Sequence, residues 1–82
     1  MVGQIEGQFL RGVYIKVDKE ARKIADVGHA LAVLSTYITH NTERRAAAIE
    51  ACKKVLRGEL HAPIARGLFV SAAVEARVLV AD

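Results

Sequence analysis

The spacing of apolar residues changes along this chain, and that change constrains the fold more than any single motif does. In residues 13–18 apolar and other side chains alternate, so that Val13, Ile15 and Val17 share one side. Such alternation is typical of a half-buried strand. After residue 26 the apolar residues recur at helical spacing in three successive segments. Strands kept apart from helices in this way predict an α+β fold.

A second short strand over residues 22–25 follows the polar residues 18–21. We therefore expect a β-hairpin whose loop holds three to four residues. No Asn-Gly or Asp-Gly pair marks the turn, so the sequence does not fix the register. The glycine-containing residues before Phe9 are expected to be irregular. We divide the chain into a flexible N-terminus, residues 1–8, and one small domain, residues 9–82.

The first two helices have recognisable ends. Asp26 is a suitable N-cap for a first helix, and Asn41 or Thr42 begins a second that runs to Arg57. Gly58 is placed to end that second helix in a left-handed conformation. The apolar face of the first helix is formed by Val27, Ala30, Leu31, Leu34, Tyr37 and Ile38. That of the second is formed by Ala48, Ile49, Cys52, Val55 and Leu56.

A third helix begins at Pro63, a residue common in the first helical turn. Its core face is formed by Ala65, Leu68, Phe69, Ala72, Ala73 and Ala76. Residues 77–80 are rich in β-branched side chains and predict a third, antiparallel strand. The predicted order is therefore β-β-α-α-α-β, with the helices packed on one face of a small antiparallel sheet.

The opposite face of the third helix is unusually apolar for a protein surface. It carries Gly67, Val70, Ser71 and Val74, of which the two small residues would let another backbone approach closely. A chain of 82 residues buries only about 60% of the surface that its unfolded form exposes, so a partner is a reasonable expectation. Two explanations stay open: a helix buried at the centre of a monomer, or an interface with a second subunit.

The chain is mildly basic, with 12 Lys and Arg against 9 Asp and Glu and a net charge of +3. Nucleic acid is therefore a candidate partner. The candidate contacts on the hairpin are Lys16, Lys19, Arg22 and Lys23. Nearby acidic residues lower the net positive charge of this group. No clear set of exposed aromatic residues lies among the cations to stack on bases, so we favour a solvated charged surface.

Catalytic, cofactor and metal sites find little support in the sequence, and we expect none. Cys52 lies at the centre of an apolar helical face, which favours a core residue over a nucleophile. The three histidines, His29, His40 and His61, do not have metal-ligand spacing. Arg66 and Glu75 flank the third helix, where such residues often lock packing through an ion pair or a cap; Arg66 is also suited to binding an anion.

A single cysteine cannot form an internal disulfide, and we identify no signal peptide at the N-terminus. Both observations favour a reducing, cytoplasmic setting. No apolar run approaches the roughly 20 residues that a membrane-spanning helix needs, so we expect no membrane partner.

The pattern of residues along this chain resembles that of a family of small bacterial proteins catalogued as domain of unknown function 982. The resemblance covers roughly residues 9–80. It is carried by Phe9, Val13 and Ile15; by Asp26, Val27 and Ala30; by Ala51, Cys52, Val55, Leu56 and Gly58; and by Ala65, Arg66, Phe69, Val70, Ala72, Ala73, Glu75 and Ala76. The chain departs from it at Gly12, where a proline is expected, and at Tyr37, where a larger aromatic is expected. The resemblance implies a compact α+β domain and supplies no catalytic residue.

From these observations we expect a cytoplasmic, non-enzymatic protein-interaction or regulatory module, with a homodimer as one form of that interaction. Nucleic-acid binding through the basic hairpin and second helix is the first alternative. A small-ligand binder or enzyme that uses Cys52, Arg66 or a histidine is the second.

Overall fold

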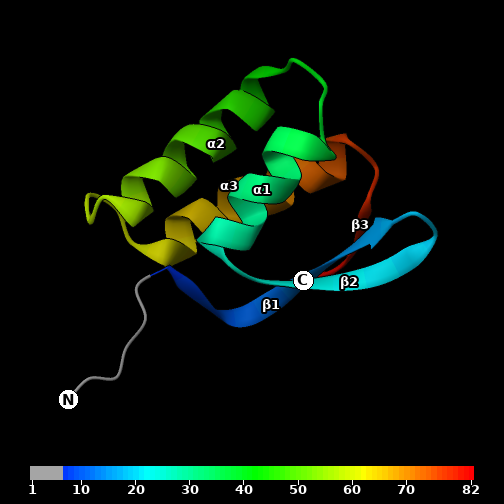
Figure 1. The fold of residues 1–82 in the computed structure, drawn as a ribbon, viewed down its shortest axis with the longest axis horizontal. Coiled ribbons are helices and arrows are strands. Elements are labelled where there is room, and N and C mark those ends of the chain that lie inside the picture. The colour runs from blue at the N-terminus through cyan, green and yellow to red at the C-terminus, as the bar shows by residue number, and fades with distance from the viewer. Residues whose placement is uncertain (1–6) are drawn as a thin grey trace.

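The computed structural model describes residues 7–82, which form three strands and three helices. In chain order these are β1 (Gln8–Val17), β2 (Glu20–Asp26), α1 (Val27–Thr36), α2 (Glu43–Leu56), α3 (Ala62–Glu75) and β3 (Leu79–Ala81). Figure 1 shows the helices gathered on one side of the sheet. The strand order is β2-β1-β3, and both pairings are antiparallel. The predicted α+β class and element order are confirmed.

β1 begins at Gln8, earlier than the alternation of apolar residues suggests. Gln8 lies opposite Asp26 of β2 and Val13 lies opposite Ile24, so the register shifts between these two pairs. A shift of this kind interrupts the in-and-out alternation of side chains, which is why residues 8–12 do not have the pattern of a strand. Of residues 1–8, which were expected to be flexible, residues 1–6 lie outside the described part of the chain and Gln8 belongs to β1.

The hairpin turn is shorter than expected. It contains only Asp18 and Lys19, whose φ angles are 52° and 69°, and the prediction of a three- to four-residue loop is wrong. Two positive φ angles are typical of the two-residue turn whose twist matches that of the paired strands. Lys19 adopts a left-handed conformation that glycine would adopt at lower cost. Because the usual glycine is absent, the two-residue turn could not be predicted from the sequence.

Asp26 caps α1 as predicted, and of the two candidates for the start of α2 the cap is Thr42. The Asp26 carboxylate accepts a hydrogen bond from the His29 backbone N–H at 2.8 Å, and the Thr42 hydroxyl accepts one from the Arg45 backbone N–H at 3.2 Å. Arg45 also caps the C-terminal end of α1, because its Nε donates to the carbonyl oxygens of Leu34 and Ile38 at 2.9 and 2.6 Å. α1 has no basic residue in its own last turn. A neighbouring helix therefore supplies the cation that its carbonyl groups favour.

α2 and α3 end in the same backbone motif with different residues. After α2, the N–H groups of Gly58 and Glu59 donate back to the carbonyls of Val55 and Lys54 at 3.0 and 2.8 Å, with φ of +77° at Gly58, as predicted. After α3, Arg77 and Val78 donate equivalently to Val74 and Ala73, both at 3.0 Å, and the left-handed residue is Arg77 with φ of 63°. An L-residue in this conformation costs about 1–2 kcal/mol, and glycine avoids that cost.

Phe69 of α3 is the largest fully buried side chain of the core. Around it pack the buried faces of the other elements, which include Val13, Ile15, Ile24, Val27, Leu34, Ala48, Cys52 and Val55. Leu56 was expected in this core but is 56% exposed, because α2 turns its Ala48, Ala51, Cys52 and Val55 edge inward instead. None of the helices in the described part of the chain is long and apolar enough to cross a membrane.

Candidate functional site

The side of α3 that points away from the core carries no charged residue before Glu75, the last residue of the helix. We call this side the outer face of α3. It comprises Pro63, Ile64, Gly67, Val70, Ser71 and Val74. Ile64 and Val74 are each about half exposed, at 50% and 52%. Gly67 is also exposed, so α3 is not sandwiched between other elements on this side.

Four members of the outer face were predicted from the sequence, and two, Pro63 and Ile64, were not. Pro63 was interpreted only as a helix-start signal, and Ile64 was assigned to neither face. Both lie in the first helical turns, on the same side as Gly67, because residues three to four apart share a helical face. That spacing was already visible in the sequence.

Within residues 7–82, no contact explains why position 67 is a glycine. It lies in the middle of a 14-residue helix, and a Cβ added there would meet no atom within 4 Å. Glycine in a helix interior costs about 1 kcal/mol relative to alanine. The described residues offer no compensating contact for that cost.

The apolar surface continues from the start of α3 onto β1. A hollow of about 250 Å³ is lined by Phe9, Leu10, Arg11, Pro63 and Arg66. Leu10 is fully exposed at the rim of that hollow. On the other flank of the outer face, α2 contributes Arg44, whose Nη1 donates to the Ser71 hydroxyl at 3.1 Å.

The exposed sides of the other two helices differ from the outer face of α3. α2 exposes a charged surface that includes Glu43, Glu50, Lys53, Lys54 and Arg57. α1 exposes small or polar side chains, namely His29, Ala32, Ser35 and Thr36. The outer face of α3 is therefore the helical surface in the described part of the chain that combines large exposed apolar side chains with no charge.

A second concave feature lies where α1 ends, α2 begins and α3 ends. This helix-end hollow has a volume of about 260 Å³ and is lined by Ile38, His40, Thr42, Ala72, Glu75, Ala76 and Arg77. The Thr42 hydroxyl donates to Glu75 Oε1 at 2.7 Å, so Glu75 joins the start of α2 to the end of α3. The sequence analysis missed the hollow because its lining comes from three separate segments.

Arg66 is a structural clamp. Its Nε donates to the Arg11 carbonyl at 2.8 Å and its Nη2 to the Asp82 carbonyl at 2.6 Å. Arg11 donates to the same Asp82 carbonyl at 2.8 Å. The start of α3, the irregular part of β1 and the residue after β3 are thereby joined. The prediction that Arg66 locks packing agrees with these contacts.

The four hairpin cations do not gather on one face. Tyr14 lies opposite Lys23 in the sheet, and strand alternation places Lys16 on the same side as Tyr14. Arg22 points to the other side and lies 3.7 Å from Glu20, while Lys19 lies in the turn. Two lysines and one 40%-exposed tyrosine thus share the outer side of the sheet. A nucleic-acid surface would normally concentrate more charge on one face.

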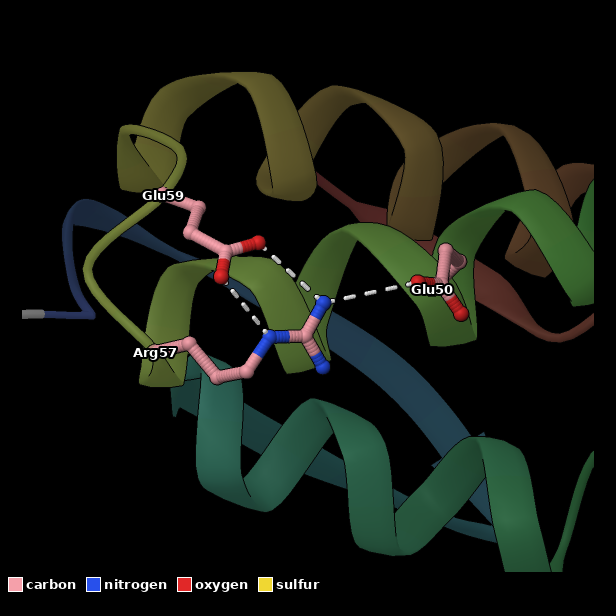
Figure 2. Close-up of polar contacts among 3 residues, drawn as sticks. All are labelled: Glu50, Arg57 and Glu59. Carbon is pink, nitrogen blue, oxygen red and sulfur yellow. Dashed lines mark hydrogen bonds and ion pairs between the residues drawn. The ribbon is translucent and has the colours of Figure 1, made fainter.

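Figure 2 shows a cluster in which Arg57 contacts two carboxylates at the end of α2. Its Nε and Nη2 donate to Glu59 at 3.2 Å each, and its Nη2 lies 3.6 Å from Glu50. The hydrogen bonds and charge of Glu59 raise the pKa of Arg57. All three side chains are about half exposed, so the cluster is a solvated surface feature that contributes little stability.

Cys52 is fully buried on the inward side of α2. Loss of solvation raises the pKa of its thiol from 9.0 to about 11. A nucleophilic cysteine needs the opposite, an accessible thiol with a lowered pKa. In residues 7–82 no three His, Cys, Asp or Glu side chains are grouped to hold a metal ion.

A family profile described as "Protein of unknown function (DUF982)" matches residues 11–80 of the chain. No curated protein and no solved structure gives a significant match to the chain.

Proposed function

Because this chain belongs to the DUF982 family, whose description assigns no activity, we propose a role from its own surface. The role is that of a non-enzymatic interaction module that forms a homodimer through the outer face of α3. We place it in the cytoplasm, where its single cysteine stays unpaired.

Gly67 is the observation that carries this proposal. Glycine destabilises the helix at this position, and no contact among the described residues offsets that loss. A side chain here would have open space around it. A glycine in a helix face allows a second backbone to approach closely. We therefore attribute the compensating contact to a partner that packs against Gly67.

The partner is a second copy of the chain because the outer face is self-complementary. Ile64, Gly67, Ser71 and Val74 are separated by three, four and three residues, so the order large, small, small, large reads the same in both directions. In an antiparallel pair of α3 helices, Ile64 faces the partner's Val74 and Gly67 faces the partner's Ser71. A two-fold interface requires this reciprocity.

Charge favours the same antiparallel arrangement. The N-terminal turn of α3 has no acidic residue and no side-chain cap, so its positive dipole is uncompensated, whereas Glu75 lies at the C-terminal end. An antiparallel pair brings each positive end beside the partner's negative end. Each chain carries a net charge of +3, but the outer face itself is uncharged and opposes no contact between copies.

Sedimentation equilibrium at high micromolar concentration tests the proposal, with Gly67→Glu as the variant. Wild-type chain is expected to sediment with twice its 8.9 kDa mass, and Gly67→Glu as a single chain. Because glutamate favours a helix over glycine by roughly 0.5–1 kcal/mol, the variant is expected to fold at least as stably as a monomer. A loss of dimer therefore cannot be attributed to unfolding.

Ala32→Glu is the matched control, since it adds the same side chain to an exposed position on α1. It is expected to leave the dimer intact. A wild-type mass of one chain, or equal loss of dimer in both variants, contradicts the proposal.

A further inference from the structure

The helix-end hollow combines an apolar floor with two unlike charges at its rim. Ile38, Ala72 and Ala76 supply apolar lining, while Glu75 and Arg77 supply a carboxylate and a guanidinium. These two groups line the same hollow without an ion pair between them. In residues 7–82 the Arg77 guanidinium forms no hydrogen bond, and Glu75 accepts one, from Thr42 at 2.7 Å. Both charges are therefore available to a ligand.

The helix dipoles around the hollow also bring a positive and a negative end together. α2 begins directly after Thr42, so the positive end of its dipole lies at the hollow, and α3 ends at Glu75, so its negative end lies there too. Glu43 occupies the first turn of α2 but does not line the hollow. His40 adds a further hydrogen-bonding side chain beside the start of α2.

Arg77 occupies a position where this chain elsewhere uses glycine. Arg77 and Gly58 take the same left-handed place in the same helix-ending motif, with φ of 63° and +77°. The motif needs no arginine, because it forms after α2 with glycine alone. What arginine adds after α3 is a guanidinium at the rim of the helix-end hollow.

From this geometry we infer that the helix-end hollow binds a small zwitterion with an apolar side group, namely a neutral apolar α-amino acid. Its carboxylate lies toward Arg77, His40 and the start of α2. Its ammonium group lies toward Glu75 and the end of α3, and its side chain rests on Ile38 and the two alanines. The volume of about 260 Å³ suits a ligand smaller than the drug-sized molecules that fill pockets of roughly 300–1,000 Å³.

Titration of ¹⁵N-labelled full-length chain with L-alanine, L-valine and L-leucine tests this inference by NMR. At least one of the three is expected to shift the amide signals of Thr42, Ala76 and Arg77 in a saturable manner below about 20 mM. Isopentylamine and 4-methylpentanoate each keep the apolar group of leucine and one of its charges. Each is expected to bind at least roughly tenfold more weakly than L-leucine, because each leaves one rim charge without a partner.

Two variants assign the effect to the rim charges. Arg77→Gly and Glu75→Gln are each expected to weaken binding by roughly tenfold or more. Arg77→Gly also relieves the left-handed strain, so its melting temperature is expected to rise by about 4 °C or more. Binding is then lost from a more stable fold, which separates a loss of the site from a loss of structure.

Lys19→Gly is the matched control, because it too replaces a cation at a positive φ of 69° by glycine, but in the hairpin turn. It is expected to bind as the wild type does. The inference is overturned if none of the three amino acids shifts these signals, if either single-charge analogue binds as well as L-leucine, or if Arg77→Gly binds unchanged. None of the residues of the outer face of α3 lines the helix-end hollow. The single-chain variant Gly67→Glu is therefore expected to bind the amino acids as the wild type does, which separates this test from that of the proposed dimer.

Discussion

Burial of one side chain decides the chemistry of Cys52. The thiol is enclosed between α2 and the rest of the core, and its pKa rises to about 11 because the thiolate would lose its solvation there. The sequence predicted this burial from the position of Cys52 on an apolar helical face. A buried, protonated thiol is a packing group and a poor nucleophile.

The raised pKa of Cys52 predicts a loss of stability in alkaline solution. Above pH 9.0 the thiol ionises in the unfolded chain, whereas in the folded chain it stays protonated up to about pH 11. The unfolded state then binds fewer protons, so the free energy of unfolding falls over this interval, by up to about 3 kcal/mol. Urea unfolding measured across the interval checks this.

Cys52→Ala provides the comparison for that measurement. Its stability is expected to be lower at neutral pH, because a small cavity remains. It is also expected to fall less steeply over the alkaline interval, because the ionising group is gone. Identical pH slopes for the two proteins would show that Cys52 does not cause the decline.

At the scale of elements, arginine side chains connect ends that the backbone leaves apart. Arg45 extends from α2 to the last carbonyls of α1, and Arg66 extends from α3 to the carbonyls of Arg11 and Asp82. Each satisfies carbonyl groups, near an element's end or in the irregular part of β1, that would otherwise depend on water. The three-residue strand β3 depends on such support, since its pairing with β1 is short and irregular.

Arg66→Met keeps much of the side-chain volume and removes both hydrogen bonds of the clamp. We expect a loss of about 1–2 kcal/mol in the free energy of unfolding, at the lower end for bonds to a charged group because these are partly solvated. The Lys16 amide, which donates to Val78 at 2.7 Å, is expected to exchange its hydrogen faster as β3 loosens.

Arg22→Met is the control for this prediction, because Arg22 makes only an exposed 3.7 Å contact with Glu20. Its effect is expected to stay below about 0.5 kcal/mol. Equal effects of the two substitutions, or an unchanged Lys16 exchange rate in Arg66→Met, would argue against the clamp.

At the scale of the whole molecule, the proposed dimer specifies which residues of two chains meet. A mixture of Gly67→Cys and Ser71→Cys chains is expected to form a disulfide-linked heterodimer under mild oxidation. The antiparallel arrangement brings these positions together, and a disulfide needs Cα atoms within about 7 Å. Non-reducing electrophoresis with mass spectrometry identifies the product.

The native Cys52 does not interfere, because it is buried and its pKa is about 11. Ala32→Cys mixed with Ser71→Cys is the control, since Ala32 lies on the exposed side of α1. A control heterodimer formed equally fast, or self-linked Gly67→Cys chains as the main product, is incompatible with the proposed register.

Much of the candidate surface was accessible to sequence analysis, whereas the hollow was not. Gly67, Val70, Ser71 and Val74 share a helical face by spacing alone, and the structure places that face outward. The helix-end hollow joins residues 38–42 to residues 72–77, and nothing in their local sequence indicates that they meet. The same holds for Arg45 and Arg66, whose acceptors lie on other elements.

The sequence by itself determined the element types, the N-cap at Asp26 and the helix end at Gly58, and it narrowed the second N-cap to Asn41 or Thr42. Each of these depends on the hydrogen bonds and spacing of residues within four positions of one another. Tertiary structure decided where β1 begins, that Leu56 faces solvent and that three helix ends enclose a charged hollow. Those outcomes depend on which distant segments pack together, and contacts across tens of residues leave no local pattern in the chain.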